Sequence, residues 1–171
     1  GCVHTPYIID LVQGLKNVGI EATADLTEIY KKYIDYAKLK FEADRSGYSW
    51  FEAPLMGDQK MPEIDITQEL LKKQLKQSDM AVITISRQAG EGIDRKIDGE
   101  FNLTPQEMKM IQDVTAAYHA ENKPVIVVIN SGSVMETTSW SAYPDAILLA
   151  WQPGEEGGNA VADILTGKVC P

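Results

Sequence analysis

Three short apolar runs constrain the fold of this chain more than any other feature. They cover residues 81–85, 125–129 and 146–150, and segments with helical periodicity lie between them. Successive side chains of a strand point to opposite faces, so a continuous apolar run indicates burial on both faces. Such strands form parallel sheets that helices cover on both sides. The pattern predicts a doubly wound α/β domain, a three-layer α/β/α sandwich with a flavodoxin-like, mostly parallel sheet.

The N-terminal third carries local signals for two helices with a short strand between them. Residues 5–19 predict a helix, with a Thr-Pro pair at its start and a glycine at its end. Residues 20–25 predict a strand, and Asp25 with Glu28 resembles a capping box for the next helix. Residues 45–64 lack periodicity and predict a long irregular loop.

The rest of the chain alternates predicted helices with the apolar runs. Residues 67–77 predict a helix before the first run. Thr104 and Glu107 form a capping-box pattern with a proline at the first helical position, which predicts a helix to about residue 121. Residues 157–165 predict the final helix, which a glycine ends.

The chain begins with a predicted helix, whereas a doubly wound domain ordinarily begins with a strand. We therefore expect the first strand of the sheet to be truncated and to lie before residue 1. Its absence would leave unpaired edges on the strands near 80–85 and 20–24, and such edges invite pairing with another chain. The expectation is a distorted N-terminal third or a homodimer formed through the exposed sheet edge.

Charge and composition exclude several functional classes. The chain length predicts a single domain over residues 1–171. A net charge of −9 without a Lys/Arg block argues against a nucleic-acid partner, because phosphate neutralisation supplies most of that affinity. No apolar stretch approaches the roughly 18 residues of a membrane span. Cys2 and Cys170 lack metal-ligand spacing; a disulfide between them stays open, and two free thiols are favoured.

A glutamate between two glycines follows the first apolar run. In open parallel sheets, ligand-binding groups gather in loops at the carboxyl ends of strands, and Gly90-Glu91-Gly92 lies in such a loop. The glycines leave the backbone unshielded, so Glu91 can approach another surface closely. Glycoside hydrolysis generally needs two carboxylates, and the chain offers no second one at an obvious partnering position. From the residues alone, a functional glutamate and a solvated surface carboxylate both remain open.

Other motifs give weaker signals. The glycines at 90 and 92 do not complete a dinucleotide fingerprint, because Arg95 stands at the position of the third glycine. Residues 166–169 fail as a P-loop, and residues 130–133 lack the frame of a nucleophile elbow. Trp50 is the tryptophan most open to stacking on a sugar, because it lies in the irregular loop, although tryptophans are more often core residues.

Several longer stretches resemble, in order, the second, α/β-sandwich domain of family 3 glycoside hydrolases, the β-glucosidase group. Together they cover most of the chain, and residues 25–65 resemble the family least. The stretches are GCVHTPYIIDLVQGLKNVG, ISRQAGEGIDRK with GEFNLTPQE, PVIVVINSGSVMETTSW and AILLAWQPGEEGGNAVADILTGKVCP.

The resemblance implies an active site shared between two domains. In the family, a preceding TIM-like barrel carries a nucleophilic aspartate, and the sandwich domain supplies the acid/base, which corresponds to Glu91. The resemblance also implies a β-glucoside substrate and no metal or organic cofactor. The remaining site residues follow from it as loop-supporting positions or as candidates for contact with substrate: Gly90, Gly92, Asp94 and Arg95 in the first group, Arg87 and Trp50 in the second.

The expected function is therefore that of an acid/base domain in a retaining, exo-acting β-glucosidase. Glu91 would protonate the leaving oxygen and then deprotonate the water that releases the sugar. The isolated chain is expected to be inactive because its nucleophile lies elsewhere. A flavodoxin-like module that binds phosphate or a nucleotide is the main alternative, and a purely structural domain is a third. Nothing in the sequence indicates a compartment.

Overall fold

The computed structural model describes residues 6–45, 61–87 and 94–171. Five helices, three strands and a short turn form these parts of the chain. In chain order they are α1 (Leu11–Asn17), α2 (Ala24–Arg45), α3 (Gln68–Gln77), β1 (Ala81–Arg87), η2 (Ile97–Phe101), α4 (Pro105–Ala120), β2 (Val125–Ser131), β3 (Ala146–Leu149) and α5 (Gly157–Leu165).

The three apolar runs form the predicted parallel sheet, but burial on both faces is found only along most of β2. In β1 buried and exposed residues alternate toward its end, and β3 is largely exposed. The strand order is β1-β2-β3 and both pairings are parallel. Ile85 pairs with Ile129 between β1 and β2, so the two strands end in register at Arg87 and Ser131. This register brings the carboxyl ends of β1 and β2 to the same edge of the sheet.

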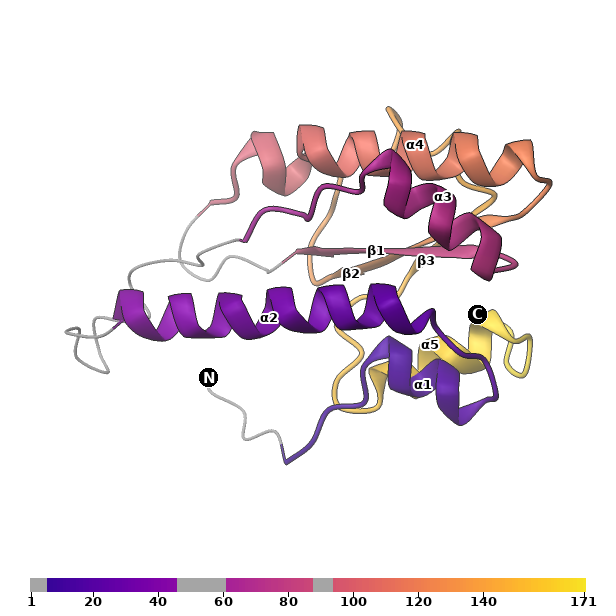
Figure 1. Ribbon diagram of the computed structural model, residues 1–171. Coiled ribbons are helices and arrows are strands. Elements are labelled where there is room, and N and C mark those ends of the chain that lie inside the picture. The colour runs from indigo at the N-terminus through magenta and orange to yellow at the C-terminus, as the bar shows by residue number, and fades with distance from the viewer. Residues whose placement is uncertain (1–5, 46–60, 88–93) are drawn as a thin grey trace.

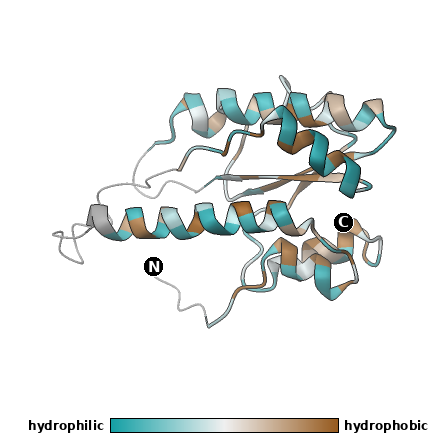
Figure 2. Cartoon of the chain, viewed as in Figure 1, coloured by the Kyte–Doolittle hydropathy of each residue, from teal (hydrophilic) through white to brown (hydrophobic). Residues whose placement is uncertain are grey.

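Helices lie on both sides of this sheet, so the predicted α/β architecture is confirmed. Figure 1 shows α3 and α4 above the strands, with α2, α1 and α5 below them. The main apolar core lies between the strands and the α3–α4 layer, where Ile83, Ile85, Ile111 and Val127 are each at most 6% exposed. The lower side is less buried: α2 is largely hydrophilic in Figure 2, and Leu39 on it is 67% exposed.

The lower layer joins the two ends of the chain. Helices α1 and α5 pack against each other, and Ile9 exchanges backbone hydrogen bonds with Glu155 and Gly158. A Cβ atom at Gly14 would lie 2.1 Å from the Gly158 carbonyl oxygen, and one at Gly158 would lie 1.9 Å from the Asp10 carbonyl oxygen. The backbones of the two helices therefore approach too closely for any side chain larger than glycine at these positions.

The first helix begins later than the sequence predicts. It starts at Leu11, and the Asp10 carboxylate caps it by accepting a 2.8 Å hydrogen bond from Gln13 N. Thr5, the predicted cap, lies outside the described residues. Residues 7–10 have no regular structure, because Ile9 bonds to Glu155 before α5 and to Gly158 within it, long-range contacts that outweigh the local helix signal.

The predicted strand at 20–25 is wrong. Residues 20–23 have no regular structure, and α2 begins at Ala24. Side chains, rather than a backbone ladder, fix this segment: Thr23 hydrogen bonds to Gln74 of α3, and Gln74 donates to Asp25. The predicted capping box is also wrong, because Asp25 lies inside the first turn of α2 and Glu28 pairs with Lys32 instead.

The helix predictions in the rest of the chain are confirmed. Thr67 caps α3 by accepting from Leu70 N, and Thr104 with Glu107 forms the reciprocal capping box of α4. The last helix matches residues 157–165, and Gly167 after it has a φ of +70°. In the described ranges, β1 has a strand partner on one side only. The strand expected before residue 1 and the homodimer therefore stay predictions.

Candidate functional site

The carboxyl end of β1 leads directly into the segment that contains Glu91. Arg87 is the last residue of β1, and the described chain resumes at Asp94, which is exposed. Arg95 follows it and is half-buried. The structure thus describes both flanks of the loop. Four predicted site residues lie outside the described residues: Trp50, Gly90, Glu91 and Gly92.

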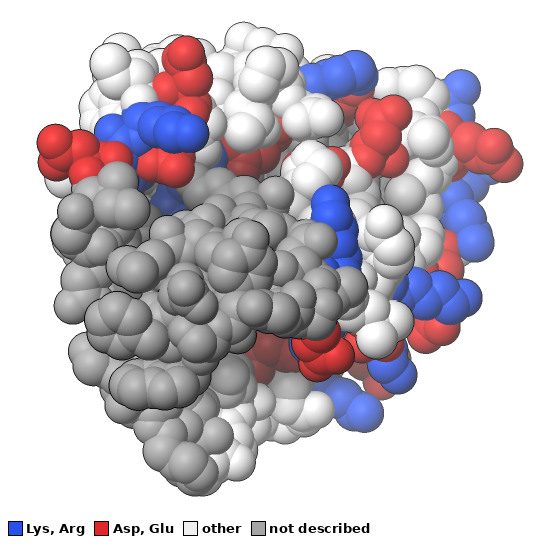
Figure 3. Space-filling model, turned by 90° about the vertical axis from the view of Figure 1, so that its left-hand side faces the viewer, with Lys and Arg blue, Asp and Glu red and all other residues white. Residues whose placement is uncertain are grey.

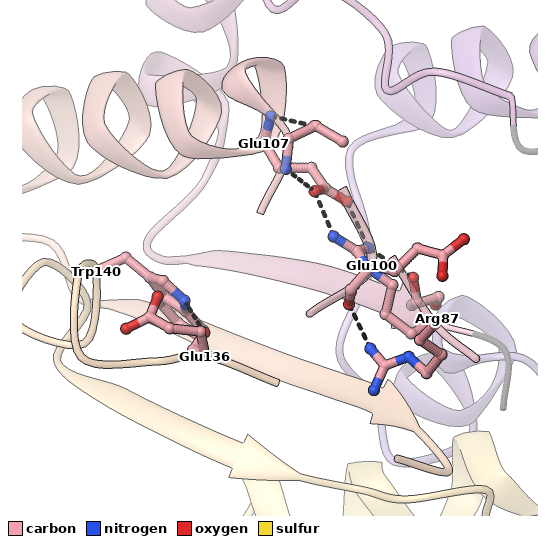
Figure 4. Close-up of polar contacts among 8 residues, drawn as sticks. Arg87, Glu100, Glu107, Glu136 and Trp140 are labelled. Carbon is pink, nitrogen blue, oxygen red and sulfur yellow. Dashed lines mark hydrogen bonds and ion pairs between the residues drawn. The ribbon is translucent and has the colours of Figure 1, made fainter. Parts of the chain in front are cut away.

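Arg87 forms a buried, two-pronged ion pair with Glu107. Its Nη1 and Nη2 atoms donate to the two Glu107 carboxylate oxygens at 2.7 and 2.6 Å (Figure 4). The two side chains are 4% and 11% exposed. Parallel paired hydrogen bonds between a guanidinium and a carboxylate fix both direction and distance. The pair therefore holds the end of β1 against the first turn of α4.

Glu107 has a second role at the start of α4. Its carboxylate accepts from Thr104 N at 2.7 Å, while its own N–H donates to the Thr104 hydroxyl at 3.2 Å. Burial by itself raises the pKa of Glu107, but the hydrogen bonds from Arg87 and Thr104 outweigh it and hold that pKa below its usual value. Glu107 is therefore a carboxylate at neutral pH and neutralises the buried Arg87.

The carbonyl oxygen of Glu100 accepts hydrogen bonds from both Arg87 and Arg95, which lie on either side of the segment that contains Glu91. Arg87 Nε donates to it at 3.2 Å, and Arg95 Nη2 donates to the same oxygen (Figure 4 shows Arg87 and Glu100). Arg87 Nη1 also donates to Ser86 O at 2.8 Å. The side chains of residues 87 and 95 thus meet at one acceptor, although the segment containing Glu91 separates them in sequence.

A tight turn places this acceptor. Lys96 N donates to the Glu100 carboxylate at 2.7 Å, and Asn102 N donates to Ile97 O at 2.8 Å. Gly99 within the turn has a φ of +75°, in the left-handed region that favours glycine. The turn η2 therefore points the Glu100 carbonyl toward the end of β1.

The loop after β2 supports the same turn. Glu136 N donates to Phe101 O at 2.9 Å, and Arg95 Nη1 donates to Val134 O. Trp140 is fully buried, and its indole N–H donates to Glu136 O at 2.8 Å (Figure 4). Trp140 is thus a core residue that anchors this loop rather than a sugar-stacking platform.

A groove of about 780 Å³ borders the end of β1. Its described lining comes from α2, residues 61–63, β1, the end of β2, the turn η2, the start of α4 and Gln152 after β3. Arg87 is the only cation among these described lining residues, and Glu107 neutralises it. Figure 3 shows this side of the molecule, where acidic and basic side chains both lie around the residues that are not described.

The sequence indicated the loop but not the contacts that hold its base. Glu107 was predicted only as a capping residue, and the backbone carbonyl of Glu100 carries no sequence signal at all. A signal for the ion pair does exist, because a charged residue ending an apolar strand needs a buried partner. The capping glutamate of the following helix lies at the same edge of the sheet and can supply it.

No group of three or more His, Cys, Asp or Glu side chains that could hold a metal ion occurs in the described ranges. No helix described there is long and apolar enough to cross a membrane. Cys170 is an exposed free cysteine, whereas Cys2 lies outside the described residues.

Comparisons with known proteins match this architecture. A model of the glycosyl hydrolase family 3 C-terminal domain matches residues 1–171. Beta-glucosidase A of Butyrivibrio fibrisolvens is 34% identical, covering 100% of this chain and 22% of its own length. A beta-glucosidase of Ruminococcus albus is 25% identical, covering 100% of this chain and 17% of its own length.

A solved structure also resembles the chain. Beta-glucosidase 3B from Thermotoga neapolitana, determined in complex with glucose, superposes with a TM-score of 0.82 and 38% sequence identity. The match covers 99% of this chain and 23% of that one. The chain thus spans 17–23% of the length of these three proteins.

Proposed function

The chain belongs to the glycosyl hydrolase family 3 C-terminal domain family, and we propose that it is the acid/base domain of a retaining, exo-acting β-glucosidase. The proposal extends the family membership to a substrate and a role. Three relatives that match over 99–100% of this chain are named β-glucosidases, and one of them was solved with glucose bound. Residues 1–171 would be a single domain of a longer enzyme, with a TIM-like barrel before it.

Glu91 is the proposed acid/base. When a nucleophilic carboxylate of the barrel bonds to the anomeric carbon, Glu91 gives its proton to the departing glycosidic oxygen. In the second step Glu91 takes a proton from water as that water attacks the anomeric carbon and the carboxylate leaves. The domain alone lacks the nucleophile, so this reaction needs both domains and no metal or organic cofactor.

One observation carries this assignment of the loop. The side chains of Arg87 and Arg95 both bind the Glu100 carbonyl, so the described ends of the segment containing Glu91 are fastened to each other. An acid catalyst must lie within hydrogen-bond reach of the oxygen it protonates, which requires a loop with a fixed base. We assign Gly90, Gly92 and Asp94 to the shape of this loop, and Trp50 to contact with the sugar.

The test is Glu91→Ala in the longer enzyme, assayed on two substrates. Cellobiose has a basic leaving group that cannot depart unprotonated, whereas a dinitrophenyl β-glucoside needs little help. We expect kcat/KM for cellobiose to fall by roughly 10²–10⁴-fold and that for the activated glucoside to fall much less. Azide needs no base and should restore turnover of the activated substrate, with β-glucosyl azide as product.

Glu121→Ala is the matched control, since Glu121 is an exposed glutamate beyond the far end of α4. It should leave both substrates and the azide response unchanged. Equal losses on both substrates in Glu91→Ala, without azide rescue, would mean that the acid/base lies elsewhere.

The phosphate- or nucleotide-binding alternative gains no support from the groove beside β1. The single cation among its described lining residues is Arg87, which Glu107 already neutralises. Anion sites need a positive group that is available to the ligand.

In the described parts of the chain β1 has no strand partner on one side, which supports a homodimer as a further proposal. An unpaired strand edge presents backbone donors and acceptors to another chain. Sedimentation equilibrium of the 171-residue chain should then show a concentration-dependent dimer, and a monomer at all concentrations would contradict this proposal.

A further inference from the structure

Four of the five N–H groups of the Arg87 guanidinium donate to atoms of its own domain. Nη1 and Nη2 bind the Glu107 carboxylate, Nε binds Glu100 O, and Nη1 also reaches Ser86 O. The residue is 7% exposed. A side chain so engaged has little capacity left for a sugar hydroxyl, although Arg87 lies on the wall of the groove beside β1.

These contacts join three elements at the base of the loop. Arg87 belongs to β1, Glu107 to α4 and Glu100 to the turn η2. Arg95 adds a fourth connection, because it binds both the Glu100 carbonyl and the Val134 carbonyl after β2. The direction in which the chain leaves β1 and the position at which it returns are thus set by one connected group of hydrogen bonds.

We propose that Arg87 and Glu107 form a positioning pair for Glu91 and act on catalysis only through it. The inference rests on the proposed function of Glu91. It assigns Arg87 to the placement of the acid/base loop rather than to contact with substrate. The ion pair and the shared Glu100 carbonyl fix the two described ends of the loop in the free domain. The conformational entropy lost in ordering these ends is therefore not lost again when the other domain binds.

The chemistry makes catalysis sensitive to such placement. Proton transfer needs a donor within hydrogen-bond distance of the leaving oxygen, and a misplacement of about 1 Å can cost about 10²-fold. A lysine at position 87 would keep the charge but could not form the paired contact with Glu107 and the Nε contact with Glu100 together. Arg87→Lys therefore weakens the base of the loop without removing the buried positive charge.

The test measures Arg87→Lys and Glu107→Gln in the longer enzyme on the same two glucosides. We expect kcat/KM for cellobiose to fall by about 10–10²-fold, and the loss on the dinitrophenyl glucoside to be much smaller. Azide should stimulate the activated substrate in both variants, because a misplaced base slows deglycosylation. A role limited to folding would lower both substrates equally, through loss of active enzyme, and would give no azide response.

A double-mutant cycle separates this inference from the function on which it rests. If Arg87 acts through Glu91, then adding Arg87→Lys to Glu91→Ala should cause almost no further loss on either substrate. Full additivity of the two losses would overturn the positioning role and indicate an independent role for Arg87. If the losses in Glu91→Ala do not depend on the leaving group, the proposed function itself fails. The Glu91→Ala single variant shows this outcome separately from the positioning role of Arg87.

Lys123→Ala provides the matched control for destabilisation. Lys123 donates to Leu75 O and Ser78 O at 2.6 and 2.7 Å, at the opposite end of the strands from the loop. This variant removes a half-buried cation that also ties elements together. It should lower stability without changing the ratio of the two substrates, and a changed ratio would contradict the assignment of that ratio to the loop base.

Discussion

The guanidinium of Arg87 lies against the carboxylate of Glu107 with two parallel hydrogen bonds of 2.7 and 2.6 Å, and both side chains are shielded from water. The pair connects the last residue of β1 with the third residue of α4. It links a strand end, from which the loop with Glu91 departs, to a capped helix start.

Glu107→Gln should destabilise the 171-residue chain by about 3–5 kcal/mol, because it leaves the buried Arg87 without a counter-charge. Glutamine keeps the capping function, so loss of the cap does not explain the effect. Urea unfolding followed by circular dichroism measures the change. Thr104→Ala removes only the cap and should cost about 1 kcal/mol. A smaller loss in Glu107→Gln than in Thr104→Ala would contradict the importance of the ion pair.

Stability should fall in acid partly because of Glu107. Its pKa is lower in the folded chain than its ordinary value of 4.5, so its contribution is fully present above that value. The contribution is lost as the pH falls below 4.5 toward the folded pKa. Urea unfolding between about pH 6 and 3 should therefore show a shallower loss of stability in Glu107→Gln than in the native chain. Parallel curves for the two proteins would refute this linkage, and Glu121→Gln serves as the control.

Gly158→Ala should separate α1 from α5. The added Cβ would lie 1.9 Å from the Asp10 carbonyl oxygen, so one backbone must move. We expect a loss of at least about 1–3 kcal/mol in thermal or urea unfolding, as for other overpacked sites. Asn159→Ala, next to it, removes the exposed hydrogen bonds with Asn17 (2.8 Å) and Glu156 (2.6 Å) without a steric conflict and should cost less. Equal effects would argue against the close approach.

Trp140→Phe should destabilise the chain, whereas Trp151→Phe should have little effect. Trp140 is 0% exposed and donates its indole N–H to Glu136 O, so phenylalanine leaves both a void and a lost hydrogen bond. Trp151 is 55% exposed. A loss of about 1–3 kcal/mol is expected at position 140 from the change in unfolding midpoint. A neutral Trp140→Phe would mean that the loop after β2 does not depend on this anchor.

The elements with strong local signals could be predicted from the sequence. The apolar runs predicted β1, β2 and β3 as a parallel sheet, and the Thr104–Glu107 capping box predicted the start of α4. Both signals depend on residues that are close together in the sequence. The late start of α1 and the absence of a strand at 20–25 could not be predicted from the sequence. They depend on contacts with α5 and α3, which are distant in the sequence.

The candidate site divides in the same way. The loop with Glu91 was predicted from its glycines and from the strand before it, and the family resemblance assigned Glu91 as the acid/base. Both stay predictions, because Glu91 lies outside the described residues. The convergence of Arg87 and Arg95 on the Glu100 carbonyl was not visible, because it depends on a backbone atom and on the path of a turn. Contacts of this kind become apparent only when the chain is folded.

The contact between α1 and α5 joins residues near opposite ends of the sequence, with Gly14 against Gly158. During synthesis on the ribosome, the first helix therefore emerges long before its partner exists. Its apolar side stays exposed to solvent, or bound by a chaperone, until the last helix has been synthesised. The sheet and its α3–α4 layer need no such delay, since their residues are complete once β3 has been translated. The lower layer is thus the last part of the domain that can close, and truncations near residue 157 should leave nascent chains with a formed sheet and an unpaired first helix.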